Sequence, residues 1–94
     1  MRVIRTSRCH DTEALFNGRR VARFANIATV AIRKLQLLHA AANLDFLRTP
    51  PSNRLEKLVG DRAGSWSIRV NAQWRLCFEW REGDAWNVEI VDYH

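Results

Sequence analysis

The chain has 94 residues, so we expect a single compact domain, residues 1–94, closed around one apolar core. Hydrophobic residues make up 47% of the chain, with four Trp and four Phe, and this composition excludes a disordered protein. Fifteen Lys and Arg against ten Asp and Glu give a net charge of +5, which favours an anionic partner such as nucleic acid or serves solubility alone.

The first part of the chain predicts a short strand followed by two helices. Residues 2–5 have the composition of a strand, and Asp11 can cap a first helix that ends at Asn17-Gly18, where glycine tolerates positive φ. Residues 20–42 contain no Gly or Pro, and their apolar residues recur with helical spacing, which predicts one long helix. The apolar stripe of that helix consists of Phe24, Ile27, Ala28, Ala31, Leu35 and Leu38.

A short turn of helix at 44–47 and a loop are expected next. The helical turn has to end before Pro50 and Pro51, because the residue that precedes a proline disfavours the α conformation. Residues 52–64 are polar and basic and include two glycines, so we expect them to be irregular and exposed.

The last third of the chain changes to a period of two, which predicts three strands in an antiparallel meander. Asn71-Ala72 and Glu82-Gly83 are the expected turns, and one face of the sheet is expected to pack on the long helix, which makes the fold class α+β. Tryptophans in phase with aliphatic residues favour core packing over a base-stacking platform. The alternating residues expected on the buried face are Trp66, Ile68, Val70, Trp74, Leu76, Phe78, Trp80, Trp86, Val88 and Ile90.

The opposite face of the predicted sheet carries polar side chains. Arg69 and Arg75 flank the first turn, and two guanidinium groups on neighbouring strands can grip a phosphate and stabilise the charge that builds on it during cleavage. Salt bridges to Glu79 and Glu89 are an equal alternative for these arginines. The set expected on this face is Ser67, Arg69, Arg75, Cys77, Glu79, Asn87 and Glu89.

Charged residues of the loop before the sheet form a second candidate group. Arg54, Glu56, Lys57, Asp61 and Arg62 lie where a flexible cationic segment can approach an RNA backbone, although a charged loop is usually only solvated.

The C-terminus is a third candidate group. The chain ends on Asp92-Tyr93-His94 directly after an apolar strand. Histidine can donate or accept a proton near neutral pH, and a nearby carboxylate can hold its ring, whereas the alternative is a frayed terminus.

The cysteines and the apolar segments exclude other classes of protein. Cys9 and Cys77 belong to no metal-ligand or disulfide spacing, so we expect reduced thiols and no metal. No segment approaches the roughly 20 apolar residues of a membrane span, and the N-terminus has no signal-peptide pattern. The sequence therefore predicts a cytoplasmic protein with no membrane partner.

Four motifs resemble the HigB toxins, also called plasmid maintenance system killer proteins, of the RelE/ParE toxin superfamily. They are G-D-R-x-G-x-W-S-I-R-V-N at 60–71, W-R-x-x-F at 74–78, G-D-A at 83–85 and D-Y-H at 92–94. The resemblance covers nearly the whole chain and implies a RelE-like fold, in which a short N-terminal strand and two helices pack on a C-terminal antiparallel sheet.

The resemblance also implies an activity and partners. It suggests a ribosome-dependent endoribonuclease that cuts mRNA in the A site without a metal or another cofactor. It implies inactivation by a helix-turn-helix antitoxin of the HigA type, with operator DNA bound only through the antitoxin complex. Two alternatives remain open, namely a ParE-like gyrase poison on the same fold and a basic nucleic-acid-binding corepressor subunit.

Several residues match family positions. Arg75 resembles the phosphate-binding strand arginine, Arg62 matches the arginine of the G-D-R loop, and Lys57 lies in the basic segment of that loop. The catalytic C-terminal stretch of the family matches Asp92, Tyr93 and His94.

One position departs from the family pattern. Some HigB proteins carry His-Pro-Leu-Lys before Gly-Asp-Arg, whereas this chain reads Glu-Lys-Leu-Val and places Glu56 at the histidine position. Our hypothesis is that Arg75, with Arg62 and Arg69 or Lys57, holds the scissile phosphate. Glu56 or His94 would take the proton from the ribose 2′-oxygen, and a 2′,3′-cyclic phosphate would remain.

Overall fold

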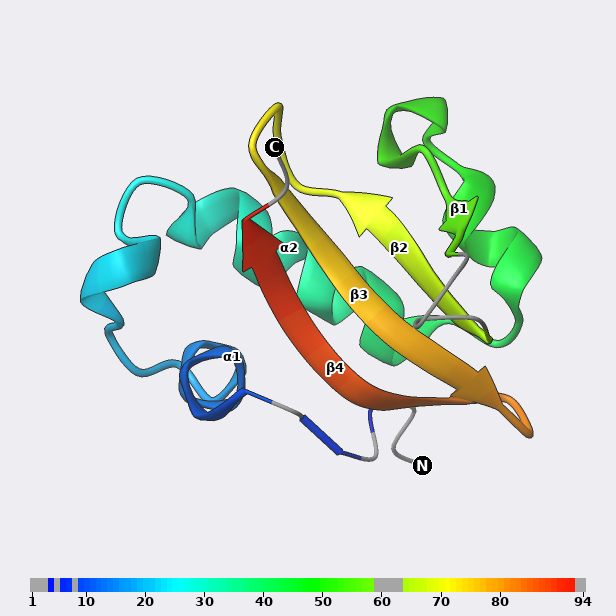
Figure 1. Cartoon of the computed structure of the whole chain (residues 1–94), viewed down its shortest axis with the longest axis horizontal. Coiled ribbons are helices and arrows are strands. Elements are labelled where there is room, and N and C mark those ends of the chain that lie inside the picture. The colour runs from blue at the N-terminus through cyan, green and yellow to red at the C-terminus, as the bar shows by residue number, and fades with distance from the viewer. Residues whose placement is uncertain (1–3, 5, 8, 59–63, 93–94) are drawn as a thin grey trace.

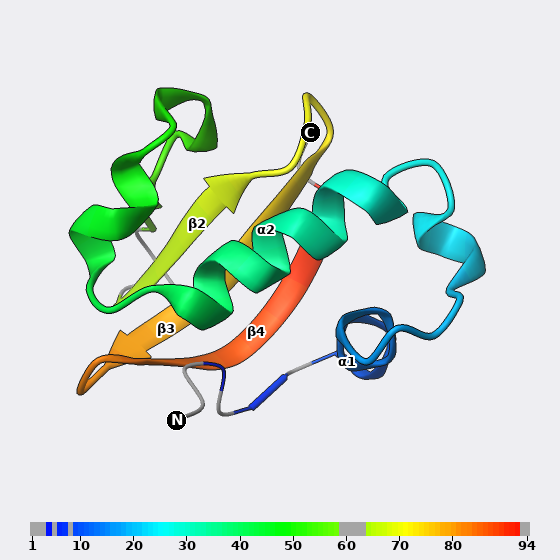
Figure 2. The same ribbon diagram turned by 180° about the vertical axis from the view of Figure 1, so that it is seen from behind.

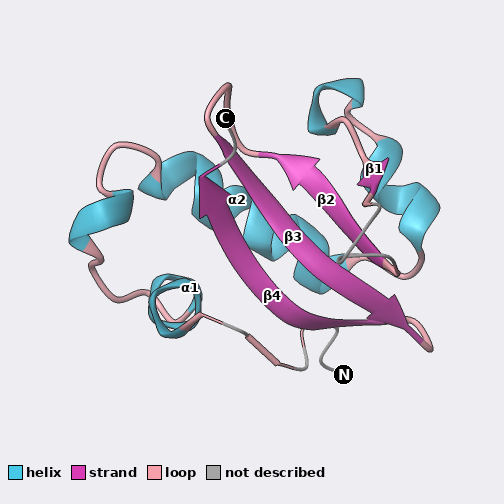
Figure 3. Ribbon diagram, viewed as in Figure 1, coloured by secondary structure: helices cyan, strands magenta, loops and turns pink. Residues whose placement is uncertain are grey.

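The computed structural model describes residues 4, 6–7, 9–58 and 64–92. Four antiparallel strands form one sheet in the order β1-β2-β3-β4, helix α2 lies across one face of it, and helix α1 lies beside β4 (Figures 1 and 2). Within the described chain, no helix covers the opposite face, which we call the open face (Figure 3). The elements are α1 (His10–Phe16), η1 (Ala22–Phe24), α2 (Ala28–Ala40), η2 (Leu44–Arg48), η3 (Pro51–Asn53), β1 (Glu56–Lys57), β2 (Ser65–Arg69), β3 (Trp74–Arg81) and β4 (Asp84–Asp92).

The meander predicted for the last third of the chain is confirmed. β2 pairs antiparallel with β3, and β3 pairs antiparallel with β4. In the turn between β3 and β4, Glu82 and Gly83 have φ angles of 53° and 80°. Two consecutive positive φ angles are typical of the tight turns whose twist matches that of the two strands they join. The fold class is α+β, with the RelE-like arrangement of helices on a sheet.

The core lies between α2 and the sheet. Ala31, Leu35 and Leu38 of α2 are each at most 1% exposed. Their helical spacing within this 13-residue helix places all three on the side that faces the strands. Trp66, Trp74 and Trp80 are partly buried and pack against this core, which confirms the core interpretation for these three tryptophans. The buried residues that the strands contribute include Ile68, Leu76, Phe78, Val88 and Ile90.

The prediction of one helix over 20–42 was wrong, although the apolar stripe is buried as expected. The chain first makes the tight turn η1, and α2 begins only at Ala28, after Ile27 with φ −120° and ψ 1°. The turn places the Phe24 ring edge-on against Trp74, with ring centroids 5.5 Å apart. This tertiary packing outweighs the weak local preference for helix.

The start of the first helix was also misplaced. Its end at Asn17-Gly18 is confirmed, but α1 begins at His10 and its N-cap is Cys9, without a side-chain capping bond. Asp11 instead lies inside the first turn and forms an ion pair with Arg23 at 3.3 Å. The carboxylate therefore joins α1 to η1 rather than capping the helix.

The N-terminal segment covers the outer edge of β4. The strand predicted at 2–5 lies mostly outside the described residues, and Ile4 forms an isolated parallel bridge to β4. The backbone N–H of Ile90 donates to the Thr12 hydroxyl of α1 at 3.0 Å. These contacts matter because an uncovered strand edge would offer its backbone groups to another chain.

The segment predicted as an irregular loop at 52–64 contains a strand. Glu56–Lys57 form β1, which pairs antiparallel with β2 at the edge of the sheet. Leu58 is also 8% exposed rather than solvated. The prediction was wrong because strand pairing depends on the neighbouring strand, whereas a polar composition indicates only that the segment is in contact with water. Residues 59–63 of the predicted loop lie outside the described chain.

Asn53 anchors this segment to α2. Its side chain is fully buried, and its Nδ2 donates to the carbonyl oxygens of Leu47 at 3.1 Å and Thr49 at 3.3 Å. Its Oδ1 accepts a hydrogen bond from Lys34 Nζ on α2. Burial, and to a lesser extent the charge of Arg33, lowers the pKa of Lys34 below its usual value. The hydrogen bond to Asn53 offsets part of the free-energy cost of removing that ammonium group from water.

The prediction that Trp86 faces the core was wrong, because this residue lies on the open face. Cys77 pairs with Glu89 and Glu79 pairs with Trp86, so β4 has one extra residue over this stretch. The resulting β-bulge contains Asn87, with φ 51°, and shifts the alternation of β4 by one position. A period-two pattern does not reveal such a shift, since the pattern assumes uninterrupted alternation.

We expect Asn53→Ala to lower the free energy of unfolding by about 1–3 kcal/mol, because two carbonyl groups and Lys34 lose their partner. Urea unfolding followed by circular dichroism measures this change. Gln36→Ala, on the exposed side of α2, is the matched control and is expected to stay within about 0.5 kcal/mol of the parent chain. Equal stability of both variants would show that the amide does not anchor the segment.

Candidate functional site

Arg75 lies on the open face of β3, among the polar residues predicted for that face. Arg75 pairs directly with Arg69 of β2. The next pair on the same face joins Cys77 of β3 to Ser67 of β2. Glu56 of β1 pairs with Ser67 and therefore shares this face. The pairings confirm the predicted side for Ser67, Arg69, Arg75, Cys77, Glu79 and Glu89.

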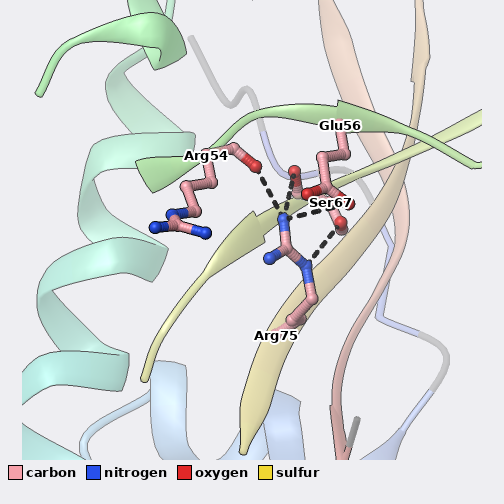
Figure 4. A network of polar contacts seen from close by, with 4 residues as sticks. All are labelled: Arg54, Glu56, Ser67 and Arg75. Atoms are coloured by element: carbon pink, nitrogen blue, oxygen red, sulfur yellow. Dashed lines mark hydrogen bonds and ion pairs between the residues drawn. The ribbon is translucent and has the colours of Figure 1, made fainter. Parts of the chain in front are cut away.

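A network of polar contacts orients the Arg75 guanidinium (Figure 4). Its Nε donates to the Ser67 hydroxyl at 2.8 Å, and its Nη2 donates to the Arg54 carbonyl oxygen at 2.6 Å and the Ser67 carbonyl oxygen at 3.4 Å. Glu56 completes the network, with its Oε2 3.9 Å from Nη2. The segment before β1 and the strand β2 thus approach the same guanidinium from two sides.

The burial of this guanidinium makes it a rigid cation. The Arg75 side chain is 9% exposed, whereas that of Glu56 is 53% exposed. An arginine remains charged even when it is largely removed from water, so its donors require acceptors of good geometry. Neutral oxygens of Ser67 and Arg54 are among its acceptors, and the Glu56 carboxylate lies 3.9 Å away. A cation held in this way is suited to an anion such as a phosphate.

Arg54 contributes to the network through its main chain. It follows η3 in the left-handed conformation, with φ 45°, which is uncommon for residues other than glycine. This conformation directs its carbonyl oxygen toward Arg75, while its side chain is exposed. The sequence singled out the Arg54 side chain as a phosphate ligand but gave no sign of its carbonyl group.

Lys57 lies apart from Arg75. Successive residues of a strand point to opposite faces, so Lys57 is on the α2 side of β1, and its Nζ lies 6.0 Å from the Trp66 ring centroid. The structure therefore brings Arg54, Glu56 and Arg69 together with Arg75 and leaves Lys57 on the other side.

Asp92 ends β4 at the same end of the sheet as Arg75. It pairs with Trp74, so the pleat sets its side chain on the opposite side from Arg75, and it accepts a hydrogen bond from Gln73 Nε2 at 3.1 Å. The other predicted site residues, Arg62, Tyr93 and His94, lie outside the described chain.

Ser67 is the member of the Arg75 network that the sequence did not reveal. Its side chain is fully buried although it lies on the open face, and its hydroxyl accepts from Arg75 Nε. The alternating pattern placed Ser67 on the correct face. Its hydrogen bond with Arg75, however, depends on the register of β2 against β3, and the strand sequences carry no clear signal of that register.

Two further features of the described chain lie away from Arg75 or are absent from it. No group of three or more His, Cys, Asp or Glu side chains gathers there to hold a metal ion, and none of the helices in that part could cross a membrane. A hollow of about 450 Å³ lies between the N-terminal segment, α1 and the end of α2, where Phe16 and His39 line it. None of the strands lines this hollow, so it is separate from the Arg75 network.

Comparison with known proteins identifies the family. A family model described as the RelE-like toxin of the type II toxin-antitoxin system HigB matches residues 17–94. Toxin HigB-1 of Vibrio cholerae is 48% identical over 66 residues, which are 70% of this chain and 70% of that protein. Endoribonuclease HigB of Proteus vulgaris is 49% identical over 41 residues, 44% of this chain and 45% of that protein. An uncharacterized protein of Haemophilus influenzae is 38% identical over 66 residues, 70% of this chain and 65% of that protein.

The family-model match extends over the whole sheet, the Arg75 network and helix α2, and it agrees with the motifs and the fold. The chain therefore belongs to the HigB-like toxins, the RelE-like toxins of type II toxin-antitoxin systems.

Proposed function

We propose that residues 1–94 act as a single toxin domain that cleaves mRNA on the ribosome, with Arg75 as its phosphate-binding residue. The observation that carries the proposal is the Arg75 network, in which a buried guanidinium is held on an open, strand-lined face by Ser67 and the Arg54 carbonyl. The Proteus vulgaris relative is named an endoribonuclease. The family match does not favour the gyrase-poisoning alternative.

Phosphate binding is assigned to the arginines of the open face. The negative charge on a phosphodiester grows as the 2′-oxygen attacks the phosphorus, and a cation that is already oriented stabilises that charge without further reorganisation. Arg75 is oriented by its bonds to Ser67, and Arg69 lies directly opposite it on β2. Arg62 and Arg54 are proposed as additional contacts to the RNA backbone.

Proton transfer is assigned to Glu56 and the C-terminal residues. The exposed carboxylate of Glu56 lies 3.9 Å from Arg75 and can accept a proton from a ribose 2′-hydroxyl beside the bound phosphate. His94 is the alternative base, and Asp92 and Tyr93 belong to the same proposed stretch, with the Asp92 side chain on the other side of the sheet from Arg75. The 2′-oxygen would displace the 5′-oxygen of the next nucleotide, which takes up a proton, and leave a 2′,3′-cyclic phosphate. No step of this proposal requires a metal or another cofactor.

The partners follow from the family and from the proposed reaction. Toxins of type II systems act with an antitoxin, so an antitoxin is a partner of this chain. We propose that this antitoxin is a HigA-like helix-turn-helix protein and that it alone carries the complex to operator DNA. The ribosome, with mRNA in the A site, would supply much of the substrate positioning that so small a domain lacks, and a cytoplasmic location follows.

We expect Arg75→Lys and Arg75→Ala to reduce mRNA cleavage roughly 100- to 1000-fold, because lysine cannot form the same pair of bonds to Ser67 and Arg54. Cleavage of a defined mRNA on purified ribosomes, with mapping of the 5′ ends, measures the loss. Arg48→Ala removes an exposed arginine that pairs with Asp45 in η2, and this control is expected to cleave normally. Full activity of Arg75→Lys would contradict phosphate binding by an oriented guanidinium.

Ser67→Ala should reduce the single-turnover cleavage rate about tenfold, because Arg75 Nε loses the acceptor that fixes its orientation. Binding of the variant to ribosomes should change much less. Ser67→Thr keeps the hydroxyl and is expected to restore most of the rate. If Ser67→Ala and Ser67→Thr cleave equally fast, the hydroxyl has no positioning role.

The assignment of the base is tested by comparing Glu56→Gln with a chain that lacks His94. Removing the residue that accepts the 2′-hydroxyl proton should lower the rate roughly 100-fold or more and abolish the acidic limb of the pH–rate profile. The other variant should keep that limb. Unchanged profiles in both variants would exclude both residues as the base, while growth arrest with intact mRNA would refute the nuclease itself.

A further inference from the structure

The four tryptophans of this chain do not all serve the core. Trp66, Trp74 and Trp80 pack against it, whereas Trp86 pairs with Glu79 on the open face. Glu79 lies four residues along β3 from Arg75, and residues two and four apart on a strand share a face. Trp86 and Arg75 therefore lie on the same side of the sheet, toward opposite ends of β3.

The local backbone is arranged so that this side chain points outward. The bulge in β4 contains Asn87 with φ 51°, a conformation that is uncommon for residues with a side chain. Three hydrogen bonds hold Asn87 in place. Its backbone N–H donates to Thr6 Oγ1 at 2.7 Å, its Nδ2 donates to Glu79 Oε2 at 2.7 Å, and its Oδ1 accepts from Thr6 Oγ1 at 3.3 Å. Bulges often re-aim a side chain next to a functional site, and backbone strain held by surrounding contacts is typical of such sites.

The exposed surroundings of Trp86 suit a planar ligand. The Arg81 guanidinium lies 4.6 Å from the centroid of the Trp86 ring and is itself 57% exposed. Glu79 forms an ion pair with this guanidinium, with its Oε1 3.7 Å from Arg81 Nε. In the described chain the indole Nε1–H of Trp86 is buried and has no hydrogen-bond partner. The part of this stacked pair that a ligand can reach is therefore the exposed Arg81 guanidinium rather than the indole N–H.

We propose that Trp86 and Arg81 form a base-stacking subsite for single-stranded RNA, which receives a nucleotide near the one whose phosphate Arg75 binds. Bases stack on aromatic rings and on guanidinium planes, and an arginine adds attraction to the backbone phosphates. Four residues of β3 separate Arg75 from the position opposite Trp86, a distance of about 13 Å along the strand. The RNA strand would cross the open face from the cationic end to the aromatic end.

The subsite rests on the proposed nuclease function, and RNA suits it better than a protein partner does. A protein interface would be expected to bury an apolar surface, whereas here the indole is covered by a cation whose outer plane remains exposed. Sequence-tolerant stacking of this kind adds affinity for a neighbouring nucleotide without taking part in the cleavage step.

Binding to ribosomes that carry an mRNA with a 2′-deoxynucleotide at the cleavage position tests the subsite. The wild-type chain, Trp86→Leu and Trp86→Phe are compared, because leucine keeps an apolar side chain without a ring and phenylalanine keeps a ring. We expect Trp86→Leu to raise Kd roughly tenfold, Trp86→Phe to stay within about threefold of wild type, and Arg81→Ala to give an intermediate increase. Rates at saturation on cleavable mRNA are expected to change by less than about twofold.

Two controls separate the possible outcomes. Affinity for the antitoxin is measured for each variant, and Arg48→Ala controls for the loss of one exposed positive charge. Equal Kd values for Trp86→Leu and wild type would overturn the subsite, and so would weaker antitoxin binding with unchanged ribosome binding. A wild-type chain that neither binds nor cleaves ribosomal mRNA would instead refute the proposed function on which the subsite rests.

Discussion

The position of β1 at the edge of the sheet depends on one buried charge, the guanidinium of Arg75. A cation this far removed from water requires acceptors on several sides, and they come from segments that are distant in the sequence. Ser67 lies on the neighbouring strand β2, the Arg54 carbonyl belongs to the segment that precedes β1, and Glu56 is the first residue of β1. Because these bonds meet at one side chain, a strand of only two residues has a defined place at the edge of the sheet.

The hydrogen bonds of Asn53 hold the segment before β1 on the side that faces α2. Asn53 immediately precedes Arg54, and its buried amide is bonded to two carbonyl groups and to Lys34 of α2. The position of the Arg54 carbonyl therefore depends on the helix on the other side of the sheet. The contacts that run from α2 through Asn53 to Arg75 give this arginine a rigid support, which a loop alone would not provide.

The open face combines cationic and aromatic groups because of a defect in regular pairing. The bulge at Asn87 moves Trp86 from the buried to the open side and fills the core position with Ala85, which is fully buried. The same bulge brings Asn87 to Glu79, and Glu79 in turn holds Arg81. One extra residue in β4 thus determines what a bound strand of RNA would meet beyond Arg75.

Local patterns were sufficient for much of the fold and for half of the candidate site. The period-two alternation correctly predicted the three long strands, and it placed Arg75 and Ser67 on the face opposite the core, since side-chain direction in a strand follows directly from position. The turn at Glu82-Gly83 was equally predictable, because the positive φ angles of a tight hairpin favour a glycine. The family motifs added the expected roles of residues that composition alone does not distinguish.

The sequence by itself determined the α+β class, the strands and the faces of their side chains, because these depend on a residue and its near neighbours. Only the tertiary structure decided that the helix breaks before Ala28, that Asn53 is buried, that Trp86 faces outward, and that Ser67 and the Arg54 carbonyl orient Arg75. Each of these depends on a partner brought close by folding, through core packing, strand register or a hydrogen bond between distant segments, and no local pattern contains that partner.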